Sequence, residues 1–330
     1  MIPFEYERAS TPEDAIRSAS AHGAKYLGGG TNLVDLMKDG VETPTTLVDV
    51  NHLKLQQITS TPGGGVIIGA SVRNSDLANN AIIRKNYPLL SEALLSGASP
   101  QLRNMATTGG NLLQRTRCYY FMDTAFPACN KRKPGSGCGA LEGYNRIHAI
   151  LGQSKDCIAT NPSDMNVAMA ALGATVHVQG VKGKRTIAFA DFHRLPGTTP
   201  QIETSLKPDE LITAVELPPA KFAANSCYLK VRDRQSYAFA LVSIAAGLEM
   251  SGSSIKSCGL ALGGVAMKPW RSPQAEKMLA GASPSPELFR KAAEQALAGA
   301  HGYEHNTFKI ELAKQNIVRA LNMAAQGRRA

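Results

Sequence analysis

Near its N-terminus the chain reads Lys25-Tyr26-Leu27-Gly28-Gly29-Gly30-Thr31-Asn32-Leu33, a glycine triplet between a short apolar run and a segment with helical spacing. The residues before the glycines predict a strand, residues 33–37 predict a helix that leaves the turn, and residues 46–50 predict a second strand. Glycines carry no Cβ, so their backbone N–H groups stay open to a ligand. This unit therefore predicts an anion site between strand and helix.

A second turn reads Thr107-Thr108-Gly109-Gly110-Asn111 and brings hydroxyl and amide donors to two adjacent glycines. Neither turn matches G-x-G-x-x-G or G-x-x-x-x-G-K-[ST], so a Rossmann dinucleotide site and a P-loop kinase are both disfavoured. The glycines at 63–65 lack such donors and predict a plain turn. Two donor-rich turns in one region suit a diphosphate with a group at each end.

Four cysteines, Cys118, Cys129, Cys138 and Cys157, follow the second turn with the spacing C-x10-C-x8-C-x18-C. Structural zinc sites favour closely spaced pairs, which disfavours zinc. The segment is rich in glycine and proline, so no long regular element is expected there. An iron–sulfur cluster needs only four thiolates that converge in space, and two disulfides would also tether the segment. The spacing leaves these two alternatives open.

Composition limits the remaining classes of function. The chain has 330 residues and a formal net charge of +10, but its longest basic run is residues 131–133, so no nucleic-acid-binding stripe is expected. We expect the charge to serve solubility and the docking of acidic subunits. No signal peptide and no membrane span are predicted, because neither an apolar leader segment nor a long apolar run is present.

Three stretches carry a family resemblance: residues 25–33, residues 101–112 and Asn161-Pro162-Ser163-Asp164. They resemble the FAD-binding subunit of the molybdenum hydroxylases, the xanthine dehydrogenase and aldehyde oxidase family, and the likeness covers nearly the whole chain. Within that family, the cysteine segment and residues 232–240 look most like the FAD subunits of bacterial periplasmic aldehyde oxidases, which are heterotrimers with molybdenum, flavin and iron–sulfur cofactors.

The resemblance implies an α+β fold with a PCMH-type, vanillyl-alcohol-oxidase-like FAD-binding region in two subdomains. A C-terminal domain like that of the CO dehydrogenase flavoprotein is expected to follow. The expected bounds are 1–58, 59–220 with an iron–sulfur insert at about 115–160, and 224–330 with a three-stranded sheet and helices.

The resemblance also implies the site residues. The residues expected to bind FAD are Tyr26, Leu27, Gly28, Gly29, Gly30, Thr31, Asn32, Leu33, Thr108, Gly109, Gly110, Asn111, Ser163, Asp164, Ile212 and Lys230. The glycine turns would hold the pyrophosphate, the backbone of Ile212 would lie by the flavin ring, and Lys230 would lie near its pyrimidine edge. Because the related subunits carry a [4Fe-4S] cluster, the resemblance favours a cluster over disulfides, with Cys118, Cys129, Cys138 and Cys157 as its ligands.

The implied function is electron transfer within a heterotrimer. A molybdenum-cofactor large subunit would oxidise the substrate, and a small subunit with [2Fe-2S] clusters would pass the electrons to FAD in this chain and so to an external acceptor. No catalytic residue is expected, which fits the absence of hydrolase and metalloprotease motifs.

Three other interpretations stay open. They are the FAD subunit of a related hydroxylase or reductase acting on xanthine, CO or hydroxybenzoyl-CoA, a stand-alone flavin oxidase, and a scaffold stabilised by zinc or disulfides. Periplasmic location by co-export with a partner is expected from the resemblance, and the cytoplasm is the alternative.

Overall fold

The computed structural model describes residues 1–328 and shows three sheets. The first is a parallel sheet in the order β1-β3-β2, built from β1 (Glu5–Arg8), β2 (Ala24–Leu27) and β3 (Thr46–Asp49). Helix α1 (Pro12–Ala19) begins where Thr11 accepts a hydrogen bond from Asp14 N, and its buried apolar face packs on this sheet. Helix α2 (Leu33–Lys38) follows the glycine triplet, so the predicted strand–turn–helix–strand unit is confirmed.

The second sheet is antiparallel and joins strands that are far apart in the sequence. Its order is β4-β5-β8-β6-β7. The strands are β4 (Ile58–Ser60), β5 (Val66–Gly69), β6 (Thr175–Gly180), β7 (Gly183–Ala188) and β8 (Leu211–Leu217). The helices of this part are α3 (Asn74–Asn79), α4 (Ala81–Asn86), α5 (Pro88–Ser96), α6 (Pro100–Met105), α7 (Thr108–Leu112), α9 (Asp164–Leu172) and α10 (Phe189–Phe192). One buried core joins the sheet to several of these helices.

The second glycine stretch forms a short helix where a turn was predicted. Thr107 Oγ1 accepts a hydrogen bond from Gly110 N at 3.2 Å, which caps the start of α7. Thr108 N and Gly109 N donate to backbone carbonyls of residues 70–72, so the first turn of α7 is anchored beside β5. With Asn111 N hydrogen-bonded to Thr107 O, the backbone N–H groups of residues 108–111 are all used within the protein, so this stretch does not offer the free N–H groups that were expected for a ligand.

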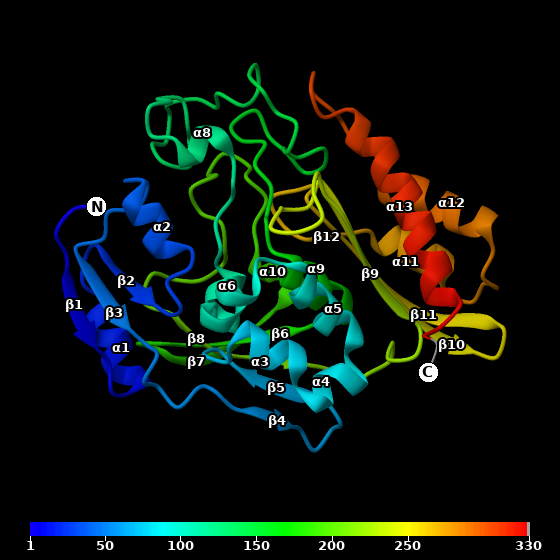
Figure 1. Ribbon diagram of the computed structural model, residues 1–330, viewed down its shortest axis with the longest axis horizontal. Helices are drawn as coiled ribbons and strands as arrows, with labels where there is room; N and C mark the ends of the chain where they lie inside the picture. The colour runs from blue at the N-terminus through cyan, green and yellow to red at the C-terminus, as the bar shows by residue number, and fades with distance from the viewer. Residues whose placement is uncertain (329–330) are drawn as a thin grey trace.

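The cysteine segment between α7 and α9 contains a single short helix, α8 (Tyr119–Met122), as the glycines and prolines predicted. In Figure 1 it forms the loops at the top of the view, beside the N-terminal end of α13. All four cysteines of the segment belong to one small apolar core with Phe121, Ile158 and Leu36 of α2. This core ties the segment to the N-terminal unit.

The C-terminal part has four strands, so the predicted three-stranded sheet is wrong. The order is β12-β11-β10-β9, with β9 (Ser226–Val231), β10 (Val242–Ser251), β11 (Ser254–Gly263) and β12 (Trp270–Arg271). The additional strand has only two residues and pairs with Ala261 and Leu262, which is too short a pattern to recognise from sequence. Helices α11 (Pro273–Leu279), α12 (Pro286–Ala296) and α13 (Phe308–Ala325) form a layer on this sheet (Figure 1).

Helices α5 and α9 contact the C-terminal sheet from the second part of the chain. Tyr228, Ala245 and Ala261 of that sheet belong to the same buried core as α9. The mixed helix-and-sheet architecture confirms the α+β fold, whereas the boundaries at 58/59 and 220/224 stay predictions. Within residues 1–328, no helix combines the length and apolar character needed to cross a bilayer.

Candidate functional site

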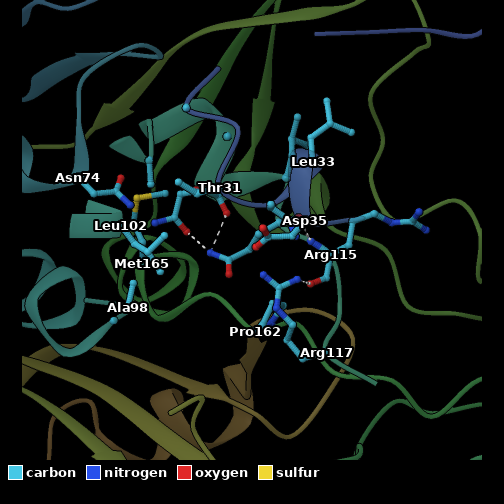
Figure 2. Close-up of a pocket in the computed structure, with 18 of the residues that line it drawn as sticks. Thr31, Leu33, Asp35, Asn74, Ala98, Leu102, Arg115, Arg117, Pro162 and Met165 are labelled. Carbon is cyan, nitrogen blue, oxygen red and sulfur yellow. Dashed lines mark hydrogen bonds between the residues drawn. The ribbon is translucent and has the colours of Figure 1, made fainter. Parts of the chain in front are cut away.

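A cavity of about 1040 Å³ lies where the three parts of the chain meet. Small-molecule sites typically enclose roughly 300–1,000 Å³, so this cavity suits a large ligand. Figure 2 shows Thr31, Asn74 and Arg115 around it, each from a different segment. The predicted site residues that line it are Tyr26, Gly28, Gly29, Gly30, Thr31, Asn32, Leu33, Gly110, Asn111, Asp164 and Lys230.

Five predicted site residues, Leu27, Thr108, Gly109, Ser163 and Ile212, are not among the residues that line the cavity. Thr108 is fully buried and donates to Val72 O, and Ile212 lies in the core of the second sheet. Ser163 caps α9 by accepting from Asn166 N, and its hydroxyl donates to Asn111 Oδ1 at 2.7 Å. Ser163 therefore positions Asn111, which does line the cavity.

Gly28 and Gly29 approach residues 105–107 so closely that no side chain fits. A Cβ on Gly29 would lie 2.0 Å from Met105 O, and a Cβ on Gly28 would lie 2.9 Å from Thr107 Oγ1. Contacts this short do not occur in folded proteins, so the close approach requires glycine at both positions. The two predicted turns thus form one continuous wall of backbone.

Three buried polar atoms on residues that line the cavity have no hydrogen-bond partner among residues 1–328. They are Asn32 Nδ2, Asn74 Oδ1 and Gln201 Oε1. Burying a polar group without a partner is costly, so atoms of this kind point to a ligand with both donors and acceptors. Asn74 and Gln201 carry no motif and could not have been found from the sequence.

Three cationic side chains, Arg103, Arg117 and Arg234, line the cavity without a carboxylate of residues 1–328 within 4.0 Å. Arg103 donates to Gly97 O at 2.7 Å, and Arg117 stacks over Phe239 with its guanidinium carbon 5.2 Å from the ring centroid. Burial lowers the pKa of the Arg103 and Arg117 guanidinium groups, since it disfavours their charged forms. An anionic ligand would offset that cost, as a diphosphate does.

Lys230 lies on the cavity wall as predicted and forms a buried ion pair. Its ammonium group is 2.8 Å from Asp164 Oδ2 and 3.0 Å from Ser96 O. Tyr228 donates its hydroxyl to the other oxygen of Asp164 at 2.6 Å, and burial together with this carboxylate raises the pKa of Tyr228. Both oxygens of Asp164 are thus engaged within the chain, and Lys230 lines the cavity as one half of a buried ion pair.

A second ion network joins the cavity to the cysteine segment. Arg115 pairs with Glu42 and with Glu203, and Lys131 Nζ lies 3.1 Å from the same Glu203. The Lys131 side chain is 1% exposed and also donates to Pro200 O at 2.9 Å. All four ionic residues line the cavity. Arg115 and Lys131 therefore link the cysteine segment to the cavity wall.

The loop between β9 and β10 covers another side of the cavity. Asp233, Arg234, Tyr237, Ala238 and Phe239 from this loop line it. Tyr237 has a positive φ of 51°, which is uncommon for a residue other than glycine. Its carbonyl accepts hydrogen bonds from Arg234, which hold the turn. The aromatic rings of Tyr237 and Phe239 remain 58% and 48% exposed, so this side of the cavity is reachable from solvent.

The four predicted ligand cysteines are free thiols in one cluster, three of them buried and Cys138 half-buried. Burial raises the pKa of Cys118 to about 12 and that of Cys157 to about 11, partly offset by the nearby Lys131 at Cys157. Backbone N–H groups point at three of the sulfurs, including Ala159 N at 3.4 Å from Cys157 Sγ. Such thiols are poor nucleophiles, so covalent catalysis is disfavoured.

Among residues 1–328, no group of three or more His, Cys, Asp and Glu side chains is arranged to hold a metal ion. A mononuclear zinc site draws its thiolates to about 2.3 Å from one atom. A polynuclear cluster interposes its own iron and sulfide atoms between the four cysteines, so its ligands lie farther apart. The geometry disfavours zinc and is compatible with a larger group.

The other two cysteines lie outside this cluster. Cys227 belongs to β9 and packs in the C-terminal core, with Cys258 of β11 packed against the same core. They are buried or half-buried thiols, as expected for small apolar residues.

Two family models match the chain and together cover nearly all of it. Residues 2–220 match the FAD-binding domain in molybdopterin dehydrogenase, and residues 227–324 match the CO dehydrogenase flavoprotein C-terminal domain. Among solved structures, carbon monoxide dehydrogenase from Hydrogenophaga pseudoflava is similar, with a TM-score of 0.77 and 26% identity over 98% of both chains.

Two curated relatives are similar over most of their length. The aldehyde oxidoreductase FAD-binding subunit PaoB of Escherichia coli K12 is 54% identical over 97% of this chain and 98% of the relative. The glyceraldehyde dehydrogenase medium chain of Sulfolobus acidocaldarius is 28% identical over 88% of this chain and 86% of the relative. The predicted family is confirmed: the chain belongs to the FAD-binding subunits of the molybdopterin dehydrogenases, a family of oxidoreductases.

Proposed function

We propose that the chain is the FAD subunit of an aldehyde-oxidising molybdenum hydroxylase, in complex with a molybdenum-cofactor large subunit and an iron–sulfur small subunit. The observation that carries this proposal is the 54% identity, over 97% of the chain, to an aldehyde oxidoreductase FAD-binding subunit. Relatives named as medium chains of glyceraldehyde and carbon monoxide dehydrogenases support a multi-subunit assembly.

When bound, FAD supplies a centre that accepts electrons singly and delivers them in pairs. The contribution of this chain is to hold and orient it. The glycine wall at 28–30 and the unpartnered Asn32 Nδ2 suit the pyrophosphate, with Arg103 and Arg117 as the nearby positive charges. Lys230 would offer a positive charge to the reduced flavin, and the exposed side of the cavity at Tyr237 would admit the acceptor.

Co-purification with the candidate large and small subunits tests this function. We expect a three-subunit complex with one FAD for each copy of this chain, and an aldehyde should bleach the flavin absorbance under anaerobic conditions. Xanthine and carbon monoxide are the comparison substrates. Reduction by one of them but not by aldehydes would reassign the substrate class, and a purified chain that binds FAD but no partner would contradict the assembly.

We also propose that Cys118, Cys129, Cys138 and Cys157 hold a [4Fe-4S] cluster. The support is a shared buried core that contains all four free thiols, backbone N–H groups aimed at three of the sulfurs, and Lys131 as a positive charge beside Cys157. Hydrogen bonds and nearby charges of this kind stabilise anionic clusters.

Cys129→Ser tests the cluster, and Cys258→Ser is its matched control because Cys258 lies in the C-terminal sheet. We expect near four irons and four sulfides per wild-type chain. The Cys129 variant should lose its iron and keep its flavin, and the control should keep both. FAD without iron in the wild type would contradict the cluster and leave the FAD site intact.

We propose a periplasmic location, reached by co-export with a partner that carries the signal. Cell fractionation with all subunits co-expressed tests it. Recovery of the whole complex in the cytoplasmic fraction would contradict this location.

A further inference from the structure

His148 lies against one of the four clustered cysteines. Its Nε2 atom is 3.0 Å from Cys118 Sγ, and both side chains are buried, with the histidine 1% exposed. The rings of Tyr119 and Tyr120 flank the imidazole, with centroids 6.2 and 6.3 Å away. The two partners are 30 positions apart, and the segment between them folds back to make this contact, which brings an imidazole to the edge of the cysteine cluster.

The backbone of His148 is held from the C-terminal domain. Its carbonyl accepts hydrogen bonds from Lys309 Nζ at 2.7 Å and from Asn306 Nδ2 at 3.3 Å. Lys309 is fully buried and also donates to Gly264 O at 2.6 Å, next to the end of β11. Because the ammonium joins the cysteine segment to the C-terminal sheet, the backbone of His148 cannot move away from Cys118 without breaking buried hydrogen bonds.

The chemistry of the pair depends on the protonation of the sulfur. A free thiol can donate its proton to Nε2, but a cysteine that ligates a metal is a thiolate and only accepts. With a thiolate at Cys118, the favourable tautomer carries its hydrogen on Nε2. The other ring nitrogen, Nδ1, is buried without a partner in the described part of the chain, so no hydrogen bond there opposes this tautomer.

We propose that His148 donates an Nε2–H hydrogen bond to Cys118 Sγ of the proposed cluster and thereby raises the reduction potential of that cluster. The inference rests on the cluster proposed above. A hydrogen bond to a ligand sulfur withdraws negative charge, and the reduced cluster carries one more negative charge than the oxidised one, so the bond stabilises the reduced state more. His148 is therefore a positioning and tuning residue and not itself an iron ligand.

Cys118 is distinguished from the other three ligands by this contact. Within residues 1–328, Cys118 has an imidazole nitrogen within hydrogen-bonding distance, whereas the donors to Cys138 and Cys157 are backbone N–H groups. Backbone donors persist whatever the side chains are, so the imidazole bond is the one that a substitution can remove cleanly.

The test compares His148→Phe with His148→Gln in the assembled complex. Phenylalanine keeps a planar ring but has no donor, whereas glutamine offers an N–H group. Redox titration followed by electron paramagnetic resonance should give a more negative midpoint potential for the cluster in the Phe variant, with the Gln variant closer to the wild type. His305→Phe is the control, since His305 is exposed and its ring packs on Tyr144.

A spectroscopic signature separates tuning from a merely structural role. With ¹⁵N-labelled histidine, pulsed electron paramagnetic resonance on the reduced cluster should show a weak hyperfine coupling to nitrogen that disappears in the Phe variant. A strong coupling, as from direct ligation, would overturn the inference, and so would an unchanged midpoint potential in an iron-replete Phe variant.

Iron content makes the remaining outcomes decisive. Loss of iron from both variants would overturn the inference by assigning His148 to folding of the segment. Loss of iron from the Phe variant alone would support the inference, because it would mean that the cluster needs a hydrogen-bond donor at Cys118. Absence of iron from the wild-type complex would overturn the cluster itself, which is a different failure from an iron-replete complex with an unshifted potential.

Discussion

The ammonium nitrogen of Lys230 lies 2.8 Å from Oδ2 of Asp164, and both side chains are almost fully buried, at 4% and 7% exposed. Asp164 begins α9 and Lys230 belongs to β9, so this ion pair fastens the second part of the chain to the C-terminal sheet. Both residues also line the cavity. The same contact that joins the two parts therefore fixes the ammonium group of Lys230 at the cavity wall.

Lys230→Met should destabilise the protein by roughly 3–5 kcal/mol, because it leaves the buried Asp164 carboxylate without its cation. Adding Asp164→Asn to that variant should recover part of the loss, since the uncompensated charge is then gone. Urea unfolding of the purified chains measures both. Lys291→Met, which removes an exposed pair with Glu287, should change stability by less than about 1 kcal/mol. Equal losses in the single and double variants would contradict the ion-pair argument.

Gly29→Ala should weaken FAD binding about tenfold to a hundredfold. The new methyl group would lie 2.0 Å from Met105 O, so the backbone at 105–106 must move, at a cost of roughly 1–3 kcal/mol. Ala106 lines the cavity, and its displacement distorts the FAD-binding wall. Titration of the deflavinated chain with FAD, followed by fluorescence, measures the change. Gly63→Ala is the control, since a Cβ there meets nothing within 4 Å, and equal affinities in both variants would refute the packing argument.

Acid should destabilise the protein through His193, which is fully buried. Burial lowers its pKa to about 4, whereas in the unfolded chain it titrates near its ordinary value of 6.5. Between these values the unfolded chain binds a proton that the folded chain excludes, so the free energy of unfolding falls as pH falls. The loss in the free energy of unfolding that is due to His193 reaches about 3 kcal/mol at pH 4.

Unfolding midpoints at pH 7 and pH 4.5 test this, with His193→Gln expected to be less acid-sensitive than the wild type. Glutamine keeps a donor for Leu112 O, which His193 contacts at 2.9 Å. His148 also has its pKa lowered to about 4 by burial, so part of the acid sensitivity should persist. The exposed His22→Gln is the control, and a His193 variant as acid-sensitive as this control would contradict the assignment.

The sequence was sufficient to predict the parts of the site that depend on backbone. Gly28 and Gly29 are required because no Cβ fits beside Met105 and Thr107, and that constraint is visible as a motif. The four cysteines of the insert were recognisable by type and by their confinement to one irregular segment. The strand–turn–helix–strand unit at 24–49 was predictable for the same reason, because its apolar spacing is local.

Residues whose roles depend on distant partners could not be predicted. Asn74 and Gln201 reach the cavity only because β5 pairs with β8 and the loops after α10 fold back over the insert. His148 meets Cys118 through a loop without regular structure, held by Lys309 from the last helix. The side chain of Ile212 lies in the core of the second sheet, and the expected place of its backbone beside the flavin ring stays a prediction. The positions of these residues depend on contacts between segments that are far apart in the sequence, so no local sequence pattern predicts them.

Glu203→Gln should lower the free energy of unfolding, because Glu203 joins the cavity wall to the cysteine segment. In the chain without a bound cluster, Arg115 would keep Glu42 as a partner, but Lys131, at 1% exposed, would lose its carboxylate partner and keep the carbonyl of Pro200, at a cost of roughly 3–5 kcal/mol. The nearby cations hold the pKa of Glu203 below its usual value of 4.5, against the effect of burial. Its stabilising contribution is therefore present above that pH and is lost as the pH falls below it.

The second-site variant Lys131→Met makes this prediction specific. If the uncompensated ammonium is the cause, Glu203→Gln combined with Lys131→Met should be more stable than Glu203→Gln alone, and urea unfolding at neutral pH measures the difference. Glu42→Gln serves as the comparison and should destabilise the protein less. Arg115 then still pairs with Glu203, and Lys25, the other partner of Glu42, is half-exposed. A double variant no more stable than the single one would mean that Glu203 acts through packing and not through its charge.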